Sequence, residues 1–399
     1  MRRTLTALGL EVYAVALALL GSANAVRTDE AKYLLDIPYP HPPLLRWILG
    51  LFDGWSGQEI FVRIFFATVV IQSVWMLWRV AKRLRPASAT WISLLYLLSA
   101  GTVFHAGTVM MSVVTGWQFL MLLLLYTYVS GRRMSRSPSG RMLAAVTGFF
   151  WLCSLFMAYH VALAFPIVIA ILWRCTQRWY ERSLYLALPL ALLALYSLTN
   201  PLALLRMIGT AGGEAVDLSM RFAQFGNIFL IAGSVMLAII GIFGILRSRS
   251  TALIFSFLLV CAYILLARMH YQAIFLVPFF VVGCLSLPKF FDRSFFWRGF
   301  SLFAVTFFTI WLLPKPEASP ARDVGTVLET KGYTFANRAR IVGPFGHQWQ
   351  YELPLEIVRD TPLLKNKDAD VLICIKKCDA KETRKLKQLM KEPVEVWTK

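Results

Sequence analysis

Long apolar stretches separated by short polar ones recur along the first three quarters of the chain. Most are roughly 17–22 residues long, which is the length that an α-helix needs to cross a hydrocarbon layer of about 30 Å. We therefore expect about eleven membrane-spanning helices, at residues 5–23, 59–79, 88–104, 113–130, 142–156, 160–174, 184–199, 227–246, 251–267, 271–287 and 299–313. The division between the fifth and sixth spans rests on Tyr159 and His160 alone.

The polar stretches between these spans differ in charge from one side of the predicted membrane to the other. Arginine and lysine concentrate in alternate short loops, for example within 79–85, 132–141 and 289–298. Basic loops remain on the cytoplasmic side of a membrane. The pattern therefore predicts a cytoplasmic N-terminus in the cell (inner) membrane. The loops at 24–58 and 200–226 and the tail from about 314 are expected outside.

The composition supports the same class of protein. Of the 399 residues 58% are hydrophobic, and the mean hydropathy is +0.60, which is more apolar surface than a soluble domain can bury. A formal net charge of +19 would suit nucleic acid, but its distribution follows the predicted membrane topology. We expect an all-α polytopic membrane domain at residues 1–313 and no nucleic-acid partner.

The first apolar stretch has a second interpretation. Its basic start and the sequence Ala23-Asn24-Ala25 also fit a cleaved signal peptide, whereas Glu11 within the apolar run argues against cleavage. An ionisable residue in such a stretch suggests a buried partner or a pathway, although Glu11 also lies close enough to the inner end of the span to reach the interface. Another ionisable residue in an apolar stretch, Arg63, can pair with Glu59 four residues earlier on the same helix.

Residues 314–399 change character and predict a small extracytoplasmic α/β domain. They begin with a proline-rich linker and contain an alternating run that ends at Arg340-Ile341-Val342. A strand is expected at 370–377, a charged amphipathic helix at about 379–391 and a short strand at 394–397. Cys374 and Cys378 can form a disulfide if this tail faces an oxidising compartment. The other four cysteines lie in or beside apolar stretches and are expected to be buried as small hydrophobic residues.

The most unusual polar segment is the first outer loop, which contains RTDEAKYLLDIPYPHPPLLRW at 27–47. Two adjacent carboxylates, Asp29 and Glu30, follow the first span by a few residues. They have a structural interpretation, because Thr28 can cap a helix whose first turn favours acids. They have a functional one as well, because a carboxylate beside the lipid surface can act as a general base or a metal ligand.

The order of residues in this loop resembles that of the GT-C superfamily of membrane glycosyltransferases. The matching residues are Asp29-Glu30-Ala31-Lys32-Tyr33, then His41-Pro42-Pro43-Leu44 and Trp47. Within the superfamily, the protein O-mannosyltransferase and aminoarabinose (lipid A) transferase groups are the most similar. Two weaker matches are Arg268-Met269-His270-Tyr271 leading to Pro278, and His160 leading to Pro166. With the order of spans, the large first outer loop and the outward tail, the resemblance covers essentially the whole chain.

The resemblance implies inverting transfer of a sugar from a polyprenyl-phosphate donor to an acceptor on the outer face. The acceptor can be a membrane lipid, a glycan or a protein. Asp29 matches the family's catalytic base, and Glu30 is expected to orient the site or help hold a divalent cation, the one cofactor considered. The leaving phosphate needs positive charge. The remaining substrate-binding candidates are Tyr33, His41, His160, Arg206, Arg221, Arg268, His270 and Tyr271.

Two other functions remain open from the sequence. A transporter or flippase for a lipid-linked saccharide would use a similar set of spans, although transporters usually carry polar, broken helices near the midplane. Here the polar residues gather at one face. A non-catalytic membrane assembly subunit is the third alternative, because Met110-Met111-Ser112-Val113 and Tyr159-His160 stand where the family often has an acid and a lysine.

Overall fold

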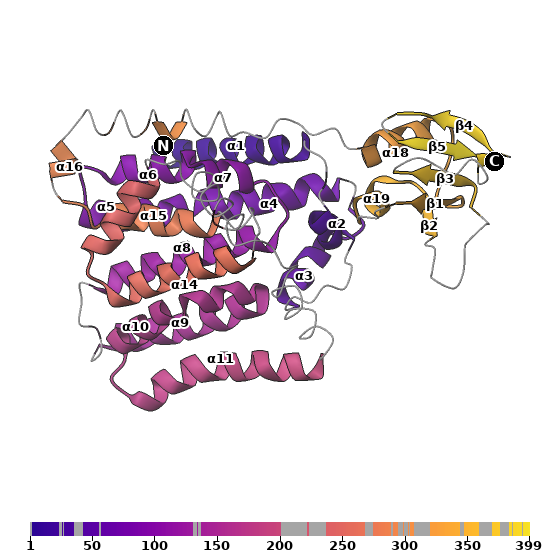
Figure 1. Ribbon diagram of the computed structural model, residues 1–399. Coiled ribbons are helices and arrows are strands. Elements are labelled where there is room, and N and C mark those ends of the chain that lie inside the picture. Colours follow the sequence, from indigo (N-terminus) through magenta and orange to yellow (C-terminus); the bar gives the residue numbers. More distant parts are fainter. Residues whose placement is uncertain are drawn as a thin grey trace. The chain divides into compact units, whose positions relative to one another are not determined.

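The computed structural model divides the chain into two compact units (Figure 1). The helical unit contains Met1–Gly21 and Pro38–Pro314, and the C-terminal unit contains Ser22–Ile37 and Lys315–Lys399. The structure describes residues 2–23, 26, 28–35, 43–55, 57–130, 134, 137–200, 222, 237–267, 274–288, 290–293, 298, 302, 304–306, 320–343, 347–358, 369–375, 383–384, 386–392 and 394–399.

Helices form nearly all of the described part of the helical unit. These are α1 (Arg2–Ala23), α3 (Leu44–Leu49), α4 (Gln58–Gln72), α5 (Val74–Leu84), α6 (Ala89–Leu98), α7 (Ala100–His105), α8 (Met111–Ser130), α9 (Pro138–Met157), α10 (Phe165–Cys175), α11 (Trp179–Thr199), α14 (Thr251–Ala267), α15 (Leu276–Cys284) and α16 (Phe290–Arg293). Short 3-10 turns occupy Gly50–Phe52 and Tyr159–Ala164, and a further helix covers Leu237–Arg247.

Five of the described helical stretches are long and apolar enough to cross a membrane. They are Thr4–Ala23, Gln58–Leu84, Met111–Ser130, Pro138–Met157 and Trp179–Thr199. Helices satisfy their own backbone hydrogen bonds, which a hydrocarbon layer demands because it offers no water. The prediction of a helical membrane protein is confirmed. The span expected at 299–313 lies mostly outside the described residues, so the number of eleven stays a prediction.

The core of the helical unit is built around α8. It packs against α10 and α15, and α10 in turn packs against α9 and α14 (Figure 1). Phe119 of α8 meets the rings of Phe275 and Phe279 edge-on, at centroid distances of 5.5 and 5.7 Å, and all three side chains are fully buried. Such contacts add dispersion energy where lipid tails weaken the hydrophobic drive for helix association.

Glycines bring two helices of this unit into close contact. A Cβ on Gly283 of α15 would overlap the backbone carbonyl of Gly241, and one on Gly244 would overlap that of Gly283. Small residues at facing positions let helix backbones approach closely inside a membrane. The helix at Leu237–Arg247 and α15 are therefore joined by backbone contact rather than by interlocking large side chains.

Polar contacts fix α1 against α4 and α6. The Glu11 carboxylate accepts hydrogen bonds from Thr68 Oγ1 at 2.6 Å and Gln72 Nε2 at 3.0 Å. The Tyr13 hydroxyl donates to the carbonyl of Leu97 at 2.9 Å. Glu11 therefore has the partners expected of an ionisable residue in an apolar stretch, and these two donors of α4 hold its carboxylate instead of leaving it to extend toward the interface.

The C-terminal unit is a small α/β fold, as the sequence predicts. Its five strands lie in the order β2-β1-β3-β5-β4, with β2, β1 and β3 parallel and β5 antiparallel to β3 and β4. The strands are β1 (Arg338–Val342), β2 (Glu356–Val358), β3 (Val371–Cys374), β4 (Lys387–Met390) and β5 (Glu395–Thr398). Its helices are α2 (Thr28–Leu34), α18 (Pro320–Thr330) and α19 (His347–Glu352).

Two details of the tail can be compared with expectation. The helix predicted at 379–391 is wrong for its last part, because residues 387–390 form β4 and pair with β5. The amphipathic spacing of a segment carries no information about its pairing with a distant strand. Here the pairing with β5 overrides the local preference for a helix. The predicted disulfide is confirmed for Cys374, which is disulfide-bonded, whereas Cys153, Cys175, Cys261 and Cys284 are free.

Candidate functional site

The acidic motif of the first outer loop forms the short helix α2. Glu30, Ala31 and Leu34 are its buried residues, with exposed fractions of 2%, 0% and 5%. Residues at i and i+4 share one face of a helix, so Glu30 and Leu34 mark a buried face of α2, and α2 packs against α19. The first outer loop thus contributes its acidic helix to the C-terminal unit, a grouping that the sequence did not indicate.

Asp29 and Tyr33 occupy a neighbouring face of α2, again one helical turn apart. The Tyr33 side chain is half-buried, and the side chain of Asp29 lies outside the described ones. The two acids therefore belong to different faces although they are adjacent in sequence. The structure shows that Glu30 is buried, and Asp29 remains the predicted base.

An ion pair supports the helix against which α2 packs. Arg322 of α18 donates from Nε and Nη2 to Glu352 Oε1 at 3.1 and 2.9 Å, and Glu352 is the last residue of α19. Arg322 Nη1 also donates to the carbonyl of Ser22 at 3.1 Å. Bidentate arginine–carboxylate pairs fix geometry as well as charge. Sequence reasoning missed both residues, because no motif links positions 30 residues apart.

An apolar groove lies in the helical unit at the end that the charge pattern predicts to face outside. Its volume is about 130 Å³, and no polar group contributes surface to it. Residues of α3, α4 and α8 and the last residue of α9 form its walls. The lining residues are Leu45, Ile48, Phe65, Phe66, Val69, Val70, Val113, Val114, Trp117 and Met157. Such a groove accepts a hydrocarbon chain and offers nothing to a sugar or a phosphate.

His160 lies in an aromatic cluster at the start of the segment that leads into α10. Its ring centroid is 4.1 Å from that of Tyr159, 5.0 Å from Tyr263 and 5.6 Å from Phe275. Both ring nitrogens are buried, and neither has a hydrogen-bond partner among the described residues. An imidazole always carries at least one N–H, so this site provides an unused donor.

Several predicted binding residues fall outside the described residues. These are His41, Arg206, Arg221, Arg268, His270 and Tyr271. Three of them lie in the segment 268–273, which connects α14 to the turn that contains Phe275. Their roles stay predictions.

The ion pair predicted between Arg63 and Glu59 in the helical unit is confirmed. Arg63 Nε donates to Glu59 Oε1 at 2.9 Å, and Arg63 Nη1 donates to the carbonyl of Gly107 at 2.9 Å. The Arg63 side chain is 1% exposed, so its charge is neutralised inside the unit. The partners of Arg63 explain its presence in an apolar helix on structural grounds. The predicted base is still Asp29 of α2.

The described residues contain no group of three or more histidine, cysteine, aspartate or glutamate side chains that could hold a metal ion. The adjacent acids of α2 are the one acidic pair that sequence reasoning connected with a cation. Because the Asp29 side chain is not among the described ones, the divalent cation stays a prediction.

Comparisons with known proteins agree on the fold. The chain is similar to ArnT from Cupriavidus metallidurans, solved bound to undecaprenyl phosphate, with a TM-score of 0.70 and 12% identity over 100% of this chain and 98% of that one. It is also similar to an oligosaccharyltransferase of Archaeoglobus fulgidus, solved with Zn and sulfate, with a TM-score of 0.53 and 10% identity over 91% of this chain and 67% of that one. No family model matches the sequence, and no curated protein matches it. The chain therefore shares its fold with these two solved structures.

Proposed function

We propose that this GT-C-fold chain is an inverting glycosyltransferase that moves a sugar from a polyprenyl-phosphate donor to an acceptor on the extracytoplasmic face of the membrane. One observation carries the proposal: the fold matches ArnT, which was solved bound to undecaprenyl phosphate, along the entire chain. Fold alone does not determine function. Two features of the chain support the proposal beyond the fold. They are the acids of α2, which offer a base, and the apolar groove, which suits a hydrocarbon chain.

The reaction needs a base, and Asp29 is the proposed one. Its carboxylate accepts the proton of an acceptor hydroxyl as that oxygen attacks the anomeric carbon of the donor. The bond from this carbon to the phosphate oxygen breaks, and polyprenyl phosphate leaves with the bonding electrons. A single displacement from the opposite face inverts the anomeric centre. No nucleotide is required, which suits a site on the outer face.

Glu30 supports the reaction indirectly. Because its side chain is only 2% exposed on a helix that packs against α19, its proposed role is to hold the helix in place. Tyr33, one turn after Asp29 on the same face, is positioned to contact the substrate that the base serves. His41 lies in the Pro-His-Pro-Pro sequence between α2 and α3, where flanking prolines stiffen the backbone.

Positive charge is required where the phosphate leaves. Arg206, Arg221 and Arg268, with His270 and Tyr271, are the proposed groups, because all belong to loops predicted on the outer side. His160 provides a buried N–H donor on the segment that leads into α10. These residues bind and orient the donor head group, while Asp29 handles the proton.

The apolar groove below α3 is the proposed seat of the isoprenoid chain. Its ten lining residues are all hydrophobic, and aromatic rings of Phe65, Phe66 and Trp117 form part of the wall. An isoprenoid is a flexible, branched hydrocarbon, which such a surface binds by dispersion and exclusion of water. The acceptor is a membrane lipid, a glycan or a protein, and the groove does not distinguish among them.

Replacement of Asp29 by Asn tests the proposal in cells. We expect a strain lacking the protein to accumulate a polyprenyl-phosphate sugar, and the wild-type gene to remove it. The D29N gene should leave the intermediate in place, because loss of a general base lowers the rate by roughly 10²–10⁴-fold. Mass spectrometry of lipid extracts measures the intermediate.

Asp53 offers a matched control, since it is exposed in the same outer loop and bonds only to Gln58 among the described residues. The D53N gene should restore transfer fully. A D29N strain with normal glycans and no accumulated intermediate would refute the assignment of Asp29. A transporter or an assembly subunit would give that result.

A further inference from the structure

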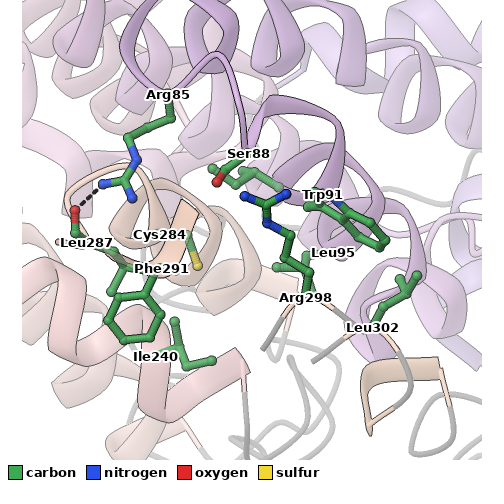
Figure 2. Close-up of a pocket in the computed structure, with 11 residues that line it drawn as sticks. Arg85, Ser88, Trp91, Leu95, Ile240, Cys284, Leu287, Phe291, Arg298 and Leu302 are labelled. Carbon is green, nitrogen blue, oxygen red and sulfur yellow. Dashed lines mark hydrogen bonds between the residues drawn. The ribbon is translucent and has the colours of Figure 1, made fainter. Parts of the chain in front are cut away.

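A second cavity lies at the opposite end of the helical unit, on the side that the charge pattern predicts to be cytoplasmic (Figure 2). Its volume is about 60 Å³. It lies between the turn that joins α5 to α6 and the residues that follow α15. Arg85, Ser88 and Arg298 contribute polar groups, and Trp91, Leu95, Ile240 and Leu302 contribute apolar walls.

Arg85 forms a fixed and neutral part of this cavity. Its Nη2 donates to Asp292 Oδ1 at 3.0 Å and to the carbonyl of Pro288 at 3.0 Å, and its Nη1 donates to the carbonyl of Leu287. The Ser88 hydroxyl donates to the same oxygen of Asp292. The side chain of Arg85 is only 8% exposed. Its charge is thus cancelled by Asp292 and its donors are used.

Arg298 differs from Arg85 in having no such compensation. Its Nε is buried and has no hydrogen-bond partner among the described residues, whereas the guanidinium of Arg85 is paired with Asp292. Figure 2 shows the Arg298 side chain directed toward Ser88, beside the ring of Trp91. A partly buried cation without an acceptor is costly. Among the described residues of the cavity, Arg298 therefore adds one positive charge beyond the Arg85–Asp292 pair.

We propose that this cavity binds the phosphodiester head group of an anionic phospholipid from the adjoining leaflet. The Arg298 guanidinium donates to the phosphate oxygens, for which its planar fork is well suited. The charges match, because Arg85 and Asp292 cancel and Arg298 leaves a single positive charge for a singly charged diester. Basic pockets between membrane helices on the cytoplasmic side are a recognised setting for such head groups.

The walls favour a lipid over free phosphate. Phosphate is hydrated on all sides and would need several donors, whereas this cavity offers one uncommitted guanidinium among mostly apolar residues. A cavity needs about 10–15 Å³ to hold one water molecule. The volume of about 60 Å³ therefore accepts a phosphate group but not a whole lipid. The glycerol and acyl chains would extend from the cavity past Leu95, Ile240 and Leu302 into the hydrocarbon layer.

Native mass spectrometry of the full-length protein in a non-ionic detergent tests this site without measuring sugar transfer. The three probes are dioctanoyl phosphatidylglycerol, dioctanoyl phosphatidylcholine and inorganic phosphate. We expect one molecule of phosphatidylglycerol to bind about tenfold or more tightly than phosphatidylcholine. R298Q should remove this preference, since it deletes a charge-assisted contact. R298K should bind with intermediate affinity, because it keeps the charge but not the fork.

Two further variants make the result specific. Arg247 is exposed on the same predicted side outside the cavity, so R247Q removes an equal charge and should bind as the wild type does. L95W fills the cavity and leaves Arg298 intact, and it should lose the preference even if R298Q does not fold. Equal phosphatidylglycerol binding in wild type, R298Q and L95W would overturn the proposal. Displacement of phosphatidylglycerol by inorganic phosphate would also overturn it, in favour of a free-phosphate site.

Discussion

At the scale of single residues, Glu30 is the acid of α2 whose side chain the structure describes. It is 2% exposed, and α2 packs against α19. The sequence identified both acids and favoured Asp29 as the base. It could not show the burial of Glu30, because the partner helix begins more than 300 residues later at His347. The proposed roles of the two acids differ, since Asp29 is the proposed base and Glu30 is buried.

This difference predicts distinct effects of the two amide substitutions. E30Q should lower the free energy of unfolding by about 1–3 kcal/mol, because it alters a buried carboxylate and the interaction that it makes. D29N should leave the stability unchanged and remove transfer. Thermal unfolding of the full-length protein in detergent measures the first effect. A wild-type midpoint for E30Q together with a lowered one for D29N would reverse the two roles.

At the scale of elements, apolar periodicity predicted the helices well and the tail less well. The described parts of the predicted spans are mostly helical, and five helical stretches are long and apolar enough to cross a membrane, where the hydrocarbon layer leaves the backbone few alternatives. In the tail, β1 and β5 lie within one residue of the predicted strand ends, but β4 was expected to be helical. Pairing with β5 decides that segment, and no local pattern encodes it.

The first helix illustrates what packing adds to a hydropathy pattern. A basic start, an apolar run and Ala23-Asn24-Ala25 fit both a signal peptide and a permanent span. The hydrogen bonds of Thr68 and Gln72 to Glu11, and that of Tyr13 to Leu97, give α1 specific partners in the helical unit. Such partners favour a retained helix, because cleavage would leave the side chains of α4 without their acceptor.

The glycine contact between α15 and the helix at Leu237–Arg247 supplies a prediction at this scale. A side chain on Gly283 would overlap the carbonyl of Gly241, so G283V should force the helices apart and lower the stability by about 1–3 kcal/mol or more. A Cβ on Gly9 of α1 would meet nothing within 4 Å, so G9V is the matched control. Unfolding midpoints that fall equally in both variants would contradict a specific close contact.

At the scale of the whole molecule, the sequence predicted a membrane domain at 1–313 and a tail domain at 314–399. The structure groups the chain differently in one respect, because Ser22–Ile37 joins the C-terminal unit. The loop that carries the acids is thus divided, with α2 in one unit and α3 in the other. Hydropathy cannot reveal this division, since it depends on contacts between distant segments of the chain.

This division gives the tail a role in the proposed chemistry. The C-terminal unit holds α2 through α19 and the Arg322–Glu352 pair, so it contributes directly to the position of the acids. The helical unit contributes the apolar groove proposed for the isoprenoid.

The most direct test of the central claim uses purified protein and a lipid-linked sugar from the deletion strain. With acceptor present, we expect the wild type and D53N to release polyprenyl phosphate and form product of inverted anomeric configuration. D29N should bind the same donor but release polyprenyl phosphate at least about 100-fold more slowly. Release by D29N at the wild-type rate, or product of retained configuration, would contradict a single displacement with Asp29 as the base.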